Sequence, residues 1–176
     1  MNLEDDVMKC AENIDNAGWS SMMLICIQGK TEDRIRGEIC SYHLKKTIPF
    51  SDIGDMVLKI DEICDWLGTP QRTTNPRFMN SEMEQRYLDA SKEHSEMVED
   101  KGIGRYGVTP FPQALKSRAV LVVIVRYRQN SSIQGTIKGR LTGDKEVSFR
   151  SALELMRMMQ CKRQIRTCSE IFGVLL

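Results

Sequence analysis

The sequence predicts an α+β fold in which one strand–strand–strand–helix unit occurs twice, near residues 22–67 and again near residues 120–162. Three observations predict it: apolar runs of strand length that recur at a nearly constant offset, a repeated I-x-G-x-I segment, and two amphipathic helices with matching first turns. Short connections favour antiparallel neighbours. The two units could therefore pair strand to strand as one six-stranded sheet, or pack back to back about a pseudo-twofold axis.

The strands of the two units align at an offset of 98 residues, which becomes 99 after one extra residue in the second connection of the later unit. Each aligned run is apolar and has the length of a strand. The residues between the runs, 130–132 and 142–145 in the later unit and 31–33 in the earlier one, have the composition of tight turns. The aligned segments are 22–27 with 120–125, 35–39 with 133–137, and 48–50 with 147–149.

A helix follows the third strand in each unit. Ser151-x-x-Glu154 is a capping box, in which the hydroxyl accepts from the third helical amide and the carboxylate reaches back to the cap amide. Asp52 and Asp55 hold the same places in the first unit. The apolar positions follow the stripe of a helix that packs one face on a sheet. They are Ile53, Met56, Val57 and Ile60 in one helix and Ala152, Leu155, Met156 and Met159 in the other.

These boundaries divide the chain into an N-terminal helix within 1–20, a first unit 21–68, a connecting region 69–117 and a second unit 118–176. The connecting region begins as a Pro-containing linker, continues as a helix over 80–100 and ends in a Gly-rich loop. The helix has an acidic side and a mostly apolar stripe whose residues are spaced alternately by four and three positions. It therefore either packs on the two units or presents this stripe to a protein partner. The residues predicted for protein interaction are Met83, Tyr87, His94 and Met97. The apolar tail 171–176 is a final strand, a docked tail or an association site.

Composition excludes several classes of protein. No apolar run reaches the length of a membrane span, and the acidic start lacks the features of a signal peptide, so we expect a cytoplasmic protein that does not meet a membrane. The six cysteines form no C-x-x-C pair and the chain has two histidines. We therefore expect reduced, mostly buried thiols and neither a disulfide framework nor a metal site.

Two glycine motifs match catalytic or cofactor signatures in their residues but not in their structural context. Gly102-x-Gly104-x-x-Gly107 follows an acidic helix and precedes a Pro-containing segment, whereas a dinucleotide site needs a strand before the glycines and a helix after them. Gly29-Lys30-Thr31 resembles the end of a phosphate-binding loop, but Leu24 stands where that loop needs glycine. We predict no catalytic residues and no cofactor, and an enzyme with an unrecognised site stays open as an alternative.

Charge is distributed unevenly. Residues 111–176 contain 12 Lys+Arg and 4 Asp+Glu, and residues 1–110 contain 13 and 20. Such asymmetry indicates either a polyanionic partner or mutual attraction between the two parts. Strand alternation over 133–141 places Lys138 and Arg140 on one polar face, with Arg126 and Arg128 sharing a face of the strand before it. Tyr127 is the one aromatic residue there that could stack on a base. The predicted polyanion-binding residues are Arg126, Arg128, Lys138, Arg140, Arg150, Arg157, Lys162, Arg163 and Arg166.

Residues 126–137, RYRQNSSIQGTI, and 149–156, FRSALELM, carry a resemblance. They are similar to small uncharacterised β-β-β-α proteins common in Firmicutes, which pair an R-Q-N-x-x-x-Q-G-x-I hairpin with an F-R-S-x-L-E-L helix. The resemblance is confined to the second unit and implies no activity. The first unit departs from the pattern at Arg36 and at Ser51-Asp52, which suggests that the two units have diverged.

Three functions are compatible with these features. The first is a non-enzymatic binding or regulatory protein, for example an inhibitor, whose basic second unit meets a nucleic acid or a nucleoprotein. The second is an adaptor, or a homodimer, that uses the acidic helix 81–100 or the apolar tail while the basic face is neutralised internally. The third is an enzyme whose site follows no known pattern.

Overall fold

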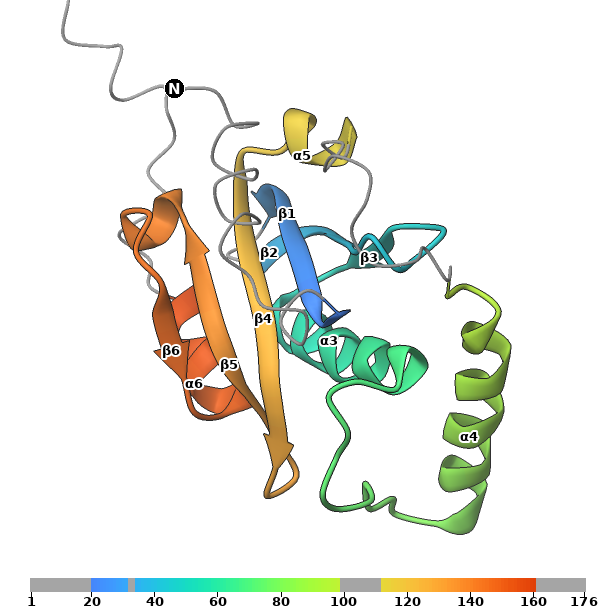
Figure 1. The fold of residues 1–176 in the computed structure, drawn as a ribbon. Helices are drawn as coiled ribbons and strands as arrows, with labels where there is room; N and C mark the ends of the chain where they lie inside the picture. The colour runs from blue at the N-terminus through green and yellow to red at the C-terminus, as the bar shows by residue number, and fades with distance from the viewer. Residues whose placement is uncertain (1–19, 32–33, 99–111, 161–176) are drawn as a thin grey trace, which may run out of the picture.

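A computed structural model describes residues 20–31, 34–98 and 112–160 (Figure 1). In this part of the chain six strands form a single antiparallel sheet with the order β3-β2-β1-β4-β5-β6. The predicted α+β class and the antiparallel sheet are confirmed. The strands are β1 Met22–Thr31, β2 Arg34–Cys40, β3 Ile48–Phe50, β4 Ala119–Gln129, β5 Ser132–Gly139 and β6 Val147–Phe149.

The two central strands join the halves of the sheet. β1 pairs with β4 from Met22 opposite Ile124 to Ile27 opposite Ala119. On either side of this junction each strand continues to its hairpin neighbour and then to a three-residue edge strand. Of the two arrangements compatible with the sequence, strand-to-strand pairing is therefore the one observed.

Four helices occur in the described residues: α3 Ile53–Leu67, α4 Ser81–Ser95, α5 Pro112–Lys116 and α6 Ala152–Met159. α3 and α6 cover one face of the sheet and share its largest core cluster, whose fully buried side chains include Ile25, Ile60 and Leu155. α4 stands beside α3, away from the sheet (Figure 1). None of the described helices is long and apolar enough to cross a membrane.

The predicted helix starts are confirmed. Asp52 accepts a hydrogen bond from the Asp55 amide at 2.9 Å, and Ser151 accepts one from the Glu154 amide at 3.1 Å. The acidic residue in each first turn reaches back one residue further than predicted, to the amide before the cap: Asp55 accepts from Ser51 at 2.9 Å and Glu154 from Arg150 at 2.6 Å. Asp55 therefore makes the same reciprocal contact as Glu154, although its side chain is shorter.

Both central strands carry a β-bulge at the same relative position. The register shifts between Ile27 and Gly29 in β1 and between Val125 and Tyr127 in β4. A bulge inserts one residue, so the side chains beyond it exchange faces relative to simple alternation. Beyond the β4 bulge, Arg128 lies opposite Ile133 of the helix-side core.

The repeated I-x-G-x-I glycines have a steric cause. Gly37 and Gly135 lie opposite the edge-strand residues Phe50 and Phe149. A methyl group on Gly135 would overlap the Ile124 carbonyl oxygen and would come within 3.1 Å of the Phe149 ring. Gly37 is enclosed in the same way by the Cys26 carbonyl and Phe50. No side chain fits between the neighbouring backbone and the aromatic ring, so glycine is required at both positions.

The opposite face of the sheet is apolar at its centre. Met22, Leu24 and Cys26 of β1 and Val120, Val122 and Ile124 of β4 are buried there, together with Cys40 and with Ala114 of α5.

Two predicted elements end early. The strand predicted over 133–141 ends at Gly139, where a short helix, η1 Arg140–Thr142, begins. The helix predicted over 80–100 ends at Ser95, and Val98 beyond it pairs with Leu44 in an isolated bridge.

Several predicted elements fall outside the described residues. They are the N-terminal helix, the glycine motif 102–107, the apolar tail 171–176 and the cysteines Cys10, Cys161 and Cys168.

Candidate functional site

Arg128 lies inside the protein, not on a cationic surface. Its side chain is 3% exposed and donates to the carboxylates of Asp61 at 2.9 Å and Asp65 at 2.7 Å, with further bonds to the backbone oxygens of Asp61 and Pro70. The prediction that Arg128 belongs to the polyanion-binding set is therefore wrong. The β4 bulge turns Arg128 toward α3, and the two carboxylates on that helix neutralise it.

Arg128 is part of a larger group of paired side chains, the Arg–Asp cluster, made of Asp61, Asp65, Arg72, Tyr87 and Arg128. Arg72 pairs with both carboxylates, and the Tyr87 hydroxyl donates to Asp65. Burial alone would raise the pKa of Asp65, but the hydrogen bonds of the cluster outweigh it and hold that pKa below its usual value of 3.8. Burial and the Asp65 charge raise the pKa of Tyr87 to about 12. The cluster ties β4, α3, the linker and α4 together.

The residues beyond the bulge leave a polar surface on the other side of the sheet. Tyr127 lies opposite Gln134, and its side chain is 60% exposed. Thr136 and Lys138 follow on the same face of β5, half-buried and opposite the apolar Ile124 and Val122. We call Tyr127, Gln134, Thr136 and Lys138 the β4–β5 face. Gln134, opposite Tyr127, and Lys138 are four residues apart, so their backbone positions lie about 13 Å apart along the strand.

The other predicted basic residues surround this face or lie elsewhere. Arg126 is the bulge residue and is half-buried. Arg140 lies in η1 and not on the strand face, because Gly139 turns the chain at φ 150°. Arg150 is exposed and bonds to Glu154 at 3.4 Å, and Arg157 is exposed on α6. Lys162, Arg163 and Arg166 are outside the described residues.

The stripe predicted on α4 packs in part on the protein itself. Tyr87 belongs to the Arg–Asp cluster, and the His94 ring stacks on Trp66 of α3 at 4.5 Å between centroids. Met97, beyond the helix, packs against the main core. Met83 is 45% exposed. Only Met83 of the four predicted residues therefore remains available to a partner.

Three described cysteines are buried free thiols, as predicted. The Cys26 and Cys40 sulfur atoms lie 3.7 Å apart on neighbouring strands. The hydrogen bond from Cys40 lowers the pKa of Cys26, and the same bond raises that of Cys40. Burial raises the pKa of Cys64 to about 12. Among the described residues no group of three side chains could hold a metal ion.

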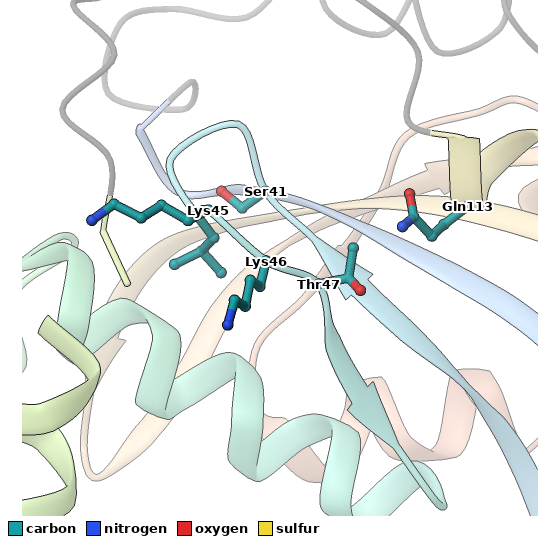
Figure 2. A pocket seen from close by; sticks show the side chains of 6 residues that line it. Ser41, Lys45, Lys46, Thr47 and Gln113 are labelled. Atoms are coloured by element: carbon teal, nitrogen blue, oxygen red, sulfur yellow. The ribbon is translucent and has the colours of Figure 1, made fainter. Parts of the chain in front are cut away.

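A pocket that sequence reasoning did not find lies at another edge of the sheet (Figure 2). It has a volume of about 490 Å³ and lies between the β2–β3 connection and α5. The Lys45 ammonium donates to the Glu96 carbonyl at 2.7 Å, and the Thr47 hydroxyl donates to Glu38 at 2.8 Å. The lining residues are Ser41, Leu44, Lys45, Lys46, Thr47 and Gln113.

No protein-family model, no curated protein and no solved structure matches this chain.

Proposed function

We propose that this chain is a non-enzymatic protein that binds single-stranded nucleic acid through the β4–β5 face. The observation that carries the proposal is the exposed Tyr127 ring on a polar sheet surface that also holds Lys138. Bases stack on exposed aromatic rings, and each stacked base contributes about 1–3 kcal/mol with little preference for sequence. Lys138, at the other end of the face, supplies a charge for the backbone phosphates.

The distribution of charge supports this proposal. Residues 112–160 contain nine basic and three acidic residues. On β4, Arg128 pairs with the acidic first half in the Arg–Asp cluster, through Asp61 and Asp65. Internal neutralisation, the alternative that the sequence left open, therefore accounts for Arg128, and the half-buried Lys138 stays on the β4–β5 face. A surplus of positive charge in one half raises affinity for phosphates by releasing counterions.

The test is fluorescence anisotropy with a labelled oligodeoxythymidine of about ten nucleotides. Tyr127→Ala is expected to weaken binding by about tenfold, and Tyr127→Phe is expected to retain it, because the ring stacks without its hydroxyl. Lys138→Gln is expected to reduce the slope of log affinity against log salt by about 0.7. Arg36→Gln, an exposed cation on β2, is the matched control and should change neither value. Equal affinity of Tyr127→Ala and the parent protein, or no binding at low salt, would refute the proposal.

An adaptor function is the second candidate, and exposed apolar side chains on α4 and just before its N-cap favour it. Met79, Met83 and Leu88 are 91%, 45% and 46% exposed, next to the acidic Glu82 and Glu84. An apolar contact of this kind weakens little with salt, whereas nucleic-acid binding weakens steeply. Measuring the salt dependence of any complex therefore separates the two candidates.

We also infer that the two halves of the sheet arose by internal duplication. The support is the coincidence of features at offsets of 98 and 99: both bulges, both enclosed glycines, both edge-strand phenylalanines and both N-caps. Each of these has a steric or hydrogen-bonding reason, so convergence on similar packing is the competing explanation. Sequence profiles built separately from homologues of 21–68 and 118–162 should match one another, and profiles that do not match would favour convergence.

A further inference from the structure

We propose that the pocket between the β2–β3 connection and α5 binds a small molecule that carries a phosphate monoester group. This site is separate from the β4–β5 face, since its residues come from other elements. Its volume of about 490 Å³ lies within the range of small-molecule sites, about 300–1,000 Å³, and exceeds what a bare phosphate ion needs.

The lining carries several side-chain hydrogen-bond donors, of which Lys46 is exposed, Gln113 is half-buried and Ser41 is buried. Within the described part of the chain, neither the Lys46 ammonium nor the Gln113 side-chain amide has a hydrogen-bond partner. Ser41 is 1% exposed, and its hydroxyl accepts from the His43 amide at 3.3 Å, which leaves its own proton to be donated. Gln113 reaches from α5 toward the connection that carries the other residues (Figure 2). Of these three donors the Ser41 hydroxyl is the buried one, and a buried donor favours an acceptor supplied by a ligand.

The charges favour an anion. The described lining residues include two lysines and no carboxylate. Lys45 donates one proton to the Glu96 carbonyl, which holds the ammonium in place without neutralising it and leaves two protons for a ligand. Glu38 does not line the pocket but accepts from the lining residue Thr47 at 2.8 Å and from Gln28 at 2.7 Å, and it keeps its charge because both donors are neutral. A phosphate monoester carries nearly two negative charges at neutral pH, and the lining offers two exposed lysines, whose side chains extend in different directions (Figure 2).

The walls of the pocket are held in place by contacts with the segment that follows α4. The Lys45 amide donates to the Met97 carbonyl at 3.0 Å, and Leu44 pairs with Val98 in a bridge. Leu44 is 5% exposed and provides an apolar wall. The same connection holds the one buried side-chain nitrogen without a partner in the described residues, His43 Nε2. A pre-formed site loses little conformational entropy when its ligand binds.

The experiment is a titration of the full chain with inorganic phosphate, adenosine monophosphate and adenosine, followed by 1H–15N correlation spectra at constant ionic strength. We expect saturable shifts at residues 41–47 and at Gln113 with both phosphate probes. Adenosine monophosphate should bind more tightly than inorganic phosphate, because the pocket is larger than the ion. Adenosine should bind more weakly than either. Equal affinity for adenosine and its monophosphate would overturn the assignment of a phosphate site.

Two charge variants and one control complete the test. Lys46→Gln is expected to weaken phosphate binding by about tenfold, the effect of removing one charge-assisted hydrogen bond. Gln113→Glu should abolish binding, because it adds a negative charge to the lining. Lys116→Gln removes an exposed lysine from α5 that does not line the pocket and should have no effect. The proposal is overturned if Lys116→Gln weakens binding as much as Lys46→Gln, or if the shifts do not saturate. Binding of the oligonucleotide at the β4–β5 face should be unchanged in Lys46→Gln, so the two proposals fail separately.

Discussion

Replacing Arg128 by methionine is expected to destabilise the fold by about 3 kcal/mol. The guanidinium is 3% exposed and is the shared partner of Asp61 and Asp65. Its removal leaves two carboxylates on one turn of α3 with only Arg72 to neutralise them. Breaking a buried ion pair by removing one partner costs about 3–5 kcal/mol. We take the lower end because the Asp61 side chain is 37% exposed and because Asp65 keeps its bonds to Arg72 and Tyr87.

Urea unfolding followed by the fluorescence of Trp66 and Trp19 measures this effect. The midpoint should fall while the slope with denaturant stays constant, since the surface exposed on unfolding does not change. Arg150→Met is the matched control. Arg150 also pairs with a carboxylate, but its side chain is 89% exposed, so we expect a loss below about 0.5 kcal/mol. The reasoning is refuted if Arg128→Met costs no more than Arg150→Met.

A lysine at position 128 should not restore the stability. The guanidinium donates to four acceptors at once: one oxygen of each carboxylate and the backbone oxygens of Asp61 and Pro70. A lysine has one nitrogen and cannot reach acceptors in this fork arrangement. Arg128→Lys should therefore fall between the parent protein and Arg128→Met. Full recovery in Arg128→Lys would show that charge alone, and not geometry, stabilises the cluster.

Two further predictions concern the repeated glycine and the response to acid. Gly135→Ala should destabilise the fold by several kcal/mol or prevent folding, because the methyl group would overlap the Ile124 carbonyl. Gly29→Ala is the control, since its methyl group would have no other atom within 4 Å. In the same urea assay it should change stability by less than about 1 kcal/mol. The lowered pKa of Asp65 means that its contribution is fully present above its unfolded-state pKa, near 3.8, and is lost as the pH falls through the folded-state value. The urea midpoint of the parent protein should therefore drop steeply below about pH 4 and that of Arg128→Met less steeply, and parallel curves would contradict this account.

Periodicity and capping predicted the scaffold because both act locally. The strand segments, the two helix starts at Asp52 and Ser151 and the antiparallel pairing all follow from side-chain alternation, N-cap chemistry and short connections. The strand order did not follow, because side-chain patterns do not specify which edges meet. The choice between one sheet and two layers depended on the β1–β4 junction, whose strands are apolar on both faces.

The site was harder to predict, since its residues are brought together by irregular structure. Simple alternation placed Arg126 and Arg128 on one face, and the β4 bulge changed the face of Arg128. One sequence signal could have located its partners: Asp61 and Asp65 are one helical turn apart on a helix that is otherwise apolar on its packed side. The pocket carried no such signal, because Gln113 and the 41–47 connection are far apart in the sequence.

The two halves of the sheet differ most in the positions that the proposed function uses. At the offset of 98, Tyr127, Gln134, Thr136 and Lys138 correspond to Gly29, Arg36, Glu38 and Cys40. The first half therefore has no aromatic ring on this face and has a carboxylate where the second has a threonine. At the offset of 99, Asp61 and Asp65 correspond in sequence to Gln160 and Gln164, so the second half of the chain has no acidic residues at these two positions. A polyanion that met the sheet would therefore find an aromatic ring and a cation together over β4 and β5, whereas β2 offers the cation Arg36 without a ring, and Arg36→Gln against Lys138→Gln measures this difference directly.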